Sequence, residues 1–208
     1  MTRSLKVLGL TVGTALALVA WTSSAVAANP QFHSEADHTT LSGFQESRNV
    51  LSVNAGLVHC STASFEGTQT NDTVTQFTIA PTYKGCLITT PTLETLEAVV
   101  DMNGCHYLFT PSGEVHLTCP SAPIRVTAPL CTITLHPQTV NKVDYTNENG
   151  GATRSITVTS TATNLAYTQS SFCHPGGGAF NNGSYFGAVV SACTDTNENH
   201  VGCWWATQ

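Results

Sequence analysis

Histidine and carboxylate side chains gather near the start of the chain, in His33-Ser-Glu-Ala-Asp-His38. Imidazole nitrogens and carboxylate oxygens are the ligands that zinc and other divalent metals take in proteins. A turn could bring His33 and His38 together, although their spacing follows no zinc motif. The segment is therefore a candidate metal site, and the alternative is a polar stretch near the N-terminus of an exported chain.

A second histidine pair, His106 and His116, lies in a predicted β-hairpin. The two strands flank Pro111-Ser-Gly113, a three-residue loop with glycine in the position that favours a left-handed backbone. Folding about the middle of this loop places both imidazoles on one face as diagonal neighbours. They can hold a metal ion if a third ligand comes from elsewhere, and otherwise they are half-buried surface histidines.

Aromatic side chains concentrate toward the C-terminus. A flat ring can stack on a sugar, so Tyr185 and Trp204 are candidate ligand-binding residues. Trp204 and Trp205 are adjacent, and neighbours on a strand point to opposite faces, so at most one of them serves a given surface. The alternative role of these rings is to cap the edge of a β fold.

Signals for catalysis are weak throughout the sequence. There is no G-x-S-x-G motif, and the cysteines are expected to be oxidised rather than nucleophilic. The neighbouring acids Glu94 and Glu97 lie in a segment predicted to be a loop. We therefore assign no catalytic residue and no cofactor, and expect a non-catalytic protein more than an enzyme.

The cysteines predict a covalent framework. Their even number and a predicted export signal favour disulfides over metal ligation, and no two of them have the C-x-x-C spacing. The hairpin around Ser112 sets residue 105 opposite residue 119, within reach of a disulfide. The other pairs are assigned to neighbours in the sequence. The expected disulfides are Cys105–Cys119, Cys60–Cys86, Cys131–Cys173 and Cys193–Cys203.

Alternation of apolar and polar residues is the main structural signal. Ile156 and Val158 fall on one face of a predicted strand, and the threonines between them fall on the other. Many such strands, separated by Asn-Gly and similar turns, indicate an all-β fold of antiparallel strands, either a sandwich or barrel-like. Residues 91–98 could instead form a short helix or a loop, and the glycine-rich residues 175–183 are predicted to be a flexible loop.

The organisation predicted along the chain has three parts. Residues 28–192 form a β-rich domain, in which an internal duplication would give two β subdomains meeting near residues 120–130. Chance recurrence in threonine-rich strands explains the same pattern equally well. Residues 193–208 are expected to form a short C-terminal tail closed by its own disulfide.

Residues 1–27 have the features of a secretory signal peptide. Arg3 and Lys6 precede an apolar segment, and Ala25-Val-Ala27 matches a cleavage site after Ala27. The apolar segment is shorter than the span of about 20 residues that crosses a bilayer, and no later segment is longer, so no membrane span is expected. The chain is predicted to be secreted.

Charge excludes one class of partner. The chain has 7 basic against 13 acidic residues and a formal net charge of −6, so a nucleic-acid partner is not expected. The composition fits a non-catalytic extracellular structural or binding protein with a glycan or another extracellular protein as partner. The alternatives are a glycan-binding module and a secreted hydrolase.

Six short motifs combine strand residues with cysteines. They are Phe32-His-Ser-Glu35, Val100-Asp-Met-Asn-Gly-Cys105, Tyr107-Leu-Phe109, Cys119-Pro120, Val126-Thr-Ala-Pro129 followed by Cys131, and Val143-Asp-Tyr-Thr-Asn147. Over residues 32–190 this pattern resembles a group of secreted, cysteine-containing bacterial β proteins that have no assigned activity. The resemblance implies a secreted β fold and carries over no catalytic residue.

Overall fold

The computed structural model describes residues 30–148 and 154–207, so the predicted signal peptide lies outside the described residues. Within these ranges the chain consists of antiparallel strands and turns without a helix, which confirms the all-β prediction. The described residues therefore include no helix that is long and apolar enough to cross a membrane. The strands are β1 (Pro30–Ser34), β2 (Thr39–Gln45), β3 (Val50–Val53), β4 (Gly56–Gln69), β5 (Thr73–Val74), β6 (Phe77–Thr89), β7 (Thr95–Asp101), β8 (His106–Phe109), β9 (Glu114–Thr118), β10 (Ile124–Ala128), β11 (Cys131–Leu135), β12 (Gln138–Asn141), β13 (Val143–Glu148), β14 (Ser155–Gln169), β15 (Gly178–Thr194), β16 (His200–Val201) and β17 (Cys203–Thr207).

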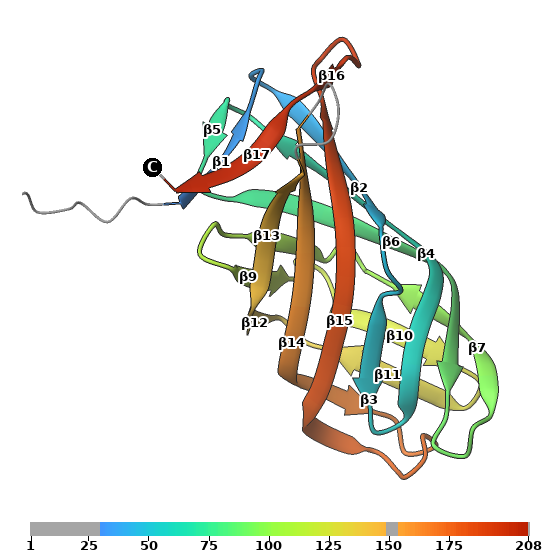
Figure 1. Ribbon diagram of the computed structural model, residues 1–208. Coiled ribbons are helices and arrows are strands. Elements are labelled where there is room, and N and C mark those ends of the chain that lie inside the picture. Colours follow the sequence, from blue (N-terminus) through green and yellow to red (C-terminus); the bar gives the residue numbers. More distant parts are fainter. Residues whose placement is uncertain (1–29, 149–153, 208) are drawn as a thin grey trace, which may run out of the picture.

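A closed ring of hydrogen-bonded strands forms one half of the molecule (Figure 1). Its order is β3, β4, β6, β7, β10, β11, β14 and β15, and β15 pairs again with β3. Of the two architectures left open by the sequence, this half therefore has the barrel-like one.

Four long strands carry the fold beyond the ring. β4 has 14 residues, β6 has 13, β14 has 15 and β15 has 17. In the second half of the molecule they pair with β2, β8 and β13, and β8 continues the sheet through β9 to β12. The result is a curled sheet whose two end strands, β12 and β13, follow one another in the chain.

Two buried clusters correspond to these halves. The ring encloses Val58, Ile88 and Ile133, whereas Phe65, Ile79 and Ile156 belong to the cluster of the curled sheet. Each cluster takes residues from both sides of residues 120–130, so the clusters do not divide the chain at that point. Both clusters also include strands β4, β6 and β14, because each of these long strands extends through both halves.

A three-stranded sheet of β1, β5 and β17 covers one end of the curled sheet. Phe32 of β1 is 1% exposed and packs edge-on against Phe77 at a ring separation of 4.4 Å. Cys193 and Cys203 are both buried here, and β17 pairs with β1 along its length. The segment expected to be a separate tail therefore contributes two buried cysteines to the core and the strand β17 to the three-stranded sheet, whereas residues 196–200 are exposed.

The four disulfides join the same cysteine pairs that were expected. Cys60 and Cys86 lie directly opposite each other on β4 and β6. The β8–β9 hairpin pairs His106 with Thr118, which sets the next residues outward, Cys105 and Cys119, opposite each other. The remaining disulfides are Cys131–Cys173 and Cys193–Cys203.

Two local predictions change in the structure. Of the helix and the loop left open for residues 91–98, residues 91–94 form a turn, where Leu93 has a positive φ of 66° and Thr90 Oγ1 accepts the Glu94 N–H. Residues 95–98, with Glu97, belong to strand β7 instead. The predicted flexible loop is partly strand, since β15 begins at Gly178. Phe180 of this added strand segment stacks on Tyr167 at a ring separation of 5.4 Å.

Candidate functional site

The first predicted metal segment, residues 33–38, contributes hydrogen bonds to the three-stranded sheet of β1, β5 and β17 and to the turns beside it. His33 shares a hydrogen bond of 3.1 Å with Thr73 Oγ1, so its Nδ1 atom already has a partner. Glu35 Oε2 accepts the Gly202 N–H at 2.8 Å, and Asp37 Oδ1 accepts the Asp72 N–H at 2.9 Å. The polar side chains therefore tie this segment to its neighbours, and His38 lies in the following turn with a φ of 56°.

The second predicted metal pair has the expected register. His106 faces Thr118 and His116 faces Leu108, so the two histidines are diagonal neighbours on the hairpin. His116 Nδ1 lies 2.8 Å from Thr139 Oγ1 of β12. Among the described residues, however, no three histidine, cysteine or acidic side chains come close enough together to hold a metal ion. Neither candidate metal site has a third ligand from the part of the chain that the structure describes.

The two candidate ligand-binding aromatics lie in different parts of the molecule. Trp204 is on β17, where its ring stacks with His33 at 5.3 Å and lies 5.0 Å from the Arg154 guanidinium. Tyr185 is on β15 and lines the interior. The two rings therefore do not form a common platform, and Trp204 already packs against neighbouring side chains.

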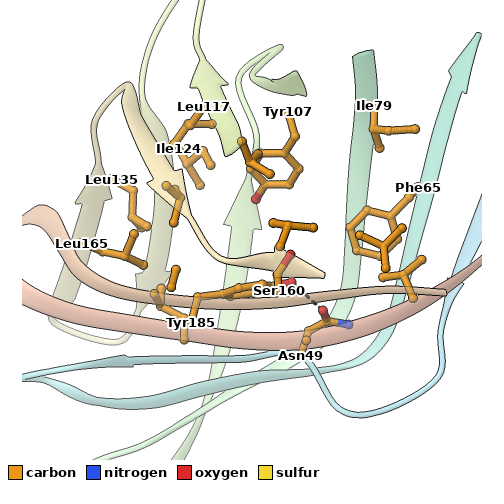
Figure 2. A pocket seen from close by; sticks show the side chains of 18 of the residues that line it. Asn49, Phe65, Ile79, Tyr107, Leu117, Ile124, Leu135, Ser160, Leu165 and Tyr185 are labelled. Carbon is orange, nitrogen blue, oxygen red and sulfur yellow. Dashed lines mark hydrogen bonds between the residues drawn. The ribbon is translucent and has the colours of Figure 1, made fainter. Parts of the chain in front are cut away.

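A cavity of about 140 Å³ lies between the two buried clusters. Its walls are mainly aliphatic and aromatic, and they come from strands of both halves of the molecule. Tyr107 and Tyr185 reach into the space from opposite walls (Figure 2). The apolar wall residues labelled in Figure 2 are Phe65, Ile79, Leu117, Ile124, Leu135 and Leu165.

A small polar cluster interrupts the apolar walls. The hydroxyl oxygens of Tyr83 and Tyr107 lie 3.3 Å apart, and the Tyr185 hydroxyl donates to Asn49 Oδ1. Asn49 is 3% exposed, and its Nδ2 atom donates to Gln45 Oε1 at 3.1 Å. The cavity thus combines a hydrophobic lining with a few fixed polar groups, which is the usual make-up of a small-molecule site.

Burial raises the pKa of all three cavity tyrosines. Desolvation is the main cause for Tyr83, and the neighbouring hydroxyls of Tyr107 and Tyr185 raise its pKa further. Desolvation also raises the pKa of Tyr107 and of Tyr185, although a hydrogen bond with Tyr83 partly opposes the shift. The cluster is therefore neutral at physiological pH and offers hydroxyl groups rather than charge.

The cavity reaches solvent between β12 and β14. Among its described lining residues, Lys142 and Thr161 are exposed, and both lie at this boundary. Among the described strands β12 pairs with β9 alone, and the Thr161 N–H donates a backbone hydrogen bond of 3.0 Å to the Lys142 carbonyl. The side-chain amide of Gln138 joins β12 to β14 along the rest of this boundary. It donates to the Ala166 carbonyl at 3.0 Å and accepts the Ala166 N–H at 2.8 Å.

The alternation of residues along β15 and β6 turns the tyrosines of the polar cluster toward the interior. On β15, Tyr185 alternates with outward residues, so it faces the interior together with Gly187 and Val189. A Cβ atom at Gly187 would collide with the Asn49 amide and the Tyr185 hydroxyl, so a larger residue here would displace the polar cluster. Tyr83 on β6 has the same parity as Phe77 and Ile79, which face the same core.

Sequence reasoning missed Tyr83, Tyr107 and Asn49 as site residues. The alternation of β6 was a usable signal, since Tyr83 shares the parity of the apolar face in that strand. Nothing in the sequence, however, indicates that β15 pairs with β3, which brings Tyr185 beside Leu51 and close to Asn49. Of the residues in the polar cluster, the sequence indicates Tyr185 alone as a ligand-binding residue, and on a surface rather than in a cavity.

A polar hollow on the outer surface is the second concave feature. It lies beside the turn between β2 and β3 and the adjoining parts of β4 and β6. Gln45 and Ser61, which line it, already bond to backbone carbonyls. Its other lining residues are Glu46, Ser47, Arg48, His59, Cys60, Gly85 and Leu87.

Comparisons of the chain with known protein families, with curated proteins and with solved structures found no match. The resemblance to a group of secreted bacterial β proteins therefore stays a prediction from the sequence motifs. The candidate site stands on its own geometry, which is a largely apolar cavity with one polar cluster and one boundary open to solvent.

Proposed function

We propose that this protein is a non-catalytic extracellular binding protein that holds a small apolar molecule in the cavity between its two cores. The observation that carries the proposal is the cavity of about 140 Å³, lined by aliphatic and aromatic side chains around three tyrosine hydroxyls. Apolar cavities of about 150 Å³ stay dry and bind molecules the size of benzene.

The size of the cavity limits the ligand. Sites for drug-sized molecules usually have volumes of roughly 300–1,000 Å³, so this one suits a single ring or a short branched chain. Burial of the ligand's surface against the apolar lining would supply most of the affinity. A polysaccharide chain does not fit this space, which favours a small apolar ligand over a glycan.

Export is part of the proposal. The predicted signal peptide of residues 1–27 and the four disulfides support an oxidising compartment outside the cytoplasm. The disulfides stabilise the folded chain, and with it the cavity, outside the cell. A secreted hydrolase is less favoured, since the described lining residues of the cavity include neutral tyrosines but no acid and no histidine.

Filling the cavity tests the proposal. Ser160 lines the cavity on β14, so Ser160→Phe would place a ring in the space that the ligand needs. We expect wild-type protein to bind at least one of phenol, toluene and indole in calorimetric titrations, and expect Ser160→Phe to lower that affinity at least ten-fold.

Thr159→Phe is the matched control. Thr159 is the preceding residue of β14, points to the opposite face and does not line the cavity. This variant should bind the compounds as the wild type does and should unfold at a similar temperature. If none of the three compounds binds the wild type, or if Ser160→Phe binds them unchanged, the proposed function is wrong.

A further inference from the structure

The charge of the cavity wall is confined to its opening. Among the described residues that line the cavity, Lys142 is the one charged side chain, and the others are apolar or carry neutral hydroxyl and amide groups. Lys142 lies between β12 and β13, where the cavity reaches solvent, and it is exposed. The opening therefore carries a positive charge that the described part of the inner lining lacks.

Backbone hydrogen bonds on both sides hold Lys142 at this opening. Its carbonyl oxygen accepts the Thr161 N–H of β14 at 3.0 Å. The next residue, Val143, donates its N–H to the Gly113 carbonyl in the β8–β9 turn at 3.1 Å. The base of the lysine side chain is thereby fixed between two elements, whereas its flexible four-carbon stem lets the ammonium group turn toward a ligand.

The acids closest to Lys142 along the strands do not neutralise it. Glu114 begins β9, where Val115 and Leu117 line the cavity, so alternation turns the Glu114 side chain to the outer face. Asp144 is exposed and follows the buried Val143 on β13. Within residues 30–148 and 154–207, Lys142 forms no ion pair with either acid. The ammonium group is therefore available to an anionic ligand.

We infer that the ligand is a compact carboxylic acid, whose apolar body fills the cavity and whose carboxylate lies at the opening against the Lys142 ammonium group. The inference rests on the proposed function, since it specifies which class of small apolar molecule the cavity selects. A carboxylate deeper in the cavity would be costly, because the described lining offers it no cation. At the opening it keeps contact with water and gains the attraction of the lysine.

Calorimetric titration of the full exported protein with benzoate, toluene and benzylammonium tests the inference. The three compounds share one ring and differ in the charge of its substituent. We expect the wild type to bind benzoate at least ten-fold more tightly than benzylammonium, which carries the same charge as Lys142. Lys142→Gln should weaken benzoate binding about five-fold, since the opening is solvated, and should leave toluene binding within about two-fold.

Charge reversal separates recognition from a structural role of the lysine. Lys142→Glu should bind benzylammonium more tightly than benzoate, an exchange of preference that a loss of packing would not produce. Lys84→Gln is the matched control, because Lys84 on β6 is exposed and lines neither of the two concave features. It removes the same charge and should keep the wild-type affinities. Ser160→Phe should weaken benzoate binding at least ten-fold, because the ring of benzoate needs the space inside the cavity.

The outcomes separate the inference from the function beneath it. If toluene binds but benzoate does not, or if Lys142→Glu still prefers benzoate, the inference is overturned while the cavity remains a site for neutral molecules. Benzoate that binds Lys142→Gln or Ser160→Phe as it binds the wild type would also overturn it, since the anion would then lie elsewhere. If neither benzoate nor toluene binds the wild type, the inference fails, and the titrations with phenol and indole decide on the proposed function.

Discussion

Tyrosine is the residue type that gives this interior its chemistry. Three tyrosines and one asparagine form the polar cluster in walls that are mainly aliphatic and aromatic. A neutral hydroxyl costs much less to bury than a carboxylate or an ammonium group. Tyrosine therefore allows a hydrogen-bonding position inside the core of a chain that has few charged residues.

The three cavity tyrosines, together with Tyr145, should make the free energy of unfolding depend on pH in the alkaline range. Burial raises the pKa of Tyr83, Tyr107, Tyr145 and Tyr185 above the ordinary value of 10.0. Above about pH 10 the unfolded chain loses these protons while the folded chain keeps them, so the folded state binds more protons. The free energy of unfolding should therefore fall as pH rises, by up to about 1.4 kcal/mol per pH unit for each tyrosine.

Urea unfolding at about pH 8 and at about pH 10.5, monitored by far-UV circular dichroism, measures this effect. Below about pH 9 the four tyrosines are protonated in both states, so they should cause no pH dependence there. Ionisation of any of these four tyrosines near pH 10 in the folded protein, seen in its own Cζ resonance by NMR, would contradict the prediction.

At the scale of elements, the boundary between β12 and β14 has no strand ladder among the described residues. Neighbouring strands in the ring are joined by backbone ladders, whereas the Gln138 side chain provides two of the contacts here. The register of β14 against β15 is also irregular between Ala162 and Leu165, next to the same boundary. We expect a ligand to enter and leave at this point.

Removal of the Gln138 amide should therefore speed up ligand exchange. Gln138→Ala deletes both hydrogen bonds to Ala166, each of which contributes about 1 kcal/mol. Association and dissociation of phenol should both become roughly ten-fold faster, with a smaller change in affinity. NMR line shapes of the bound compound measure these rates.

Thr139→Ala provides the comparison for this variant. Thr139 is also on β12, but its hydroxyl bonds to His116 of β9 and not to β14. Exchange in this variant should match the wild type. Unchanged exchange in Gln138→Ala would mean that the ligand enters elsewhere.

Elements differ in how far the sequence predicts them. The β8–β9 hairpin was predictable because three loop residues set its register and so place Cys105 opposite Cys119. The start of β15 was not, since Gly178 and Gly183 suggested a loop, whereas Gly183 packs closely against Leu165 and Tyr167. A Cβ atom there would lie 3.1 Å from Leu165, so a larger residue would require the neighbouring strand to shift.

The site was less predictable than the strands. Alternation tells which side chains share a face, but the cavity exists because β15 pairs with β3 and closes the ring. The pair Leu51 and Tyr185 joins residues far apart in the chain, and no local pattern records such a contact. The histidine and tryptophan candidates were chosen for their chemistry alone, and their strands place them away from this cavity.

At the scale of the whole molecule, the two cores should not be independent. β4 contributes Val58 to one cluster and Phe65 to the other, and β6 contributes Ile88 and Ile79 in the same way. Unfolding either core would break strands that the other core needs. The cavity lies between them, so its walls depend on both cores being folded.

A pair of matched substitutions tests this dependence. Ile133 belongs to the ring cluster and Ile156 to the cluster of the curled sheet, and both are at most 2% exposed. Ile133→Val and Ile156→Val should each destabilise the protein by about 0.5–1.5 kcal/mol. Because the strands are shared, each variant should lower the midpoint of one common thermal transition, monitored by far-UV circular dichroism. Two β subdomains that fold separately would instead give two transitions, and each substitution would then move only one of them.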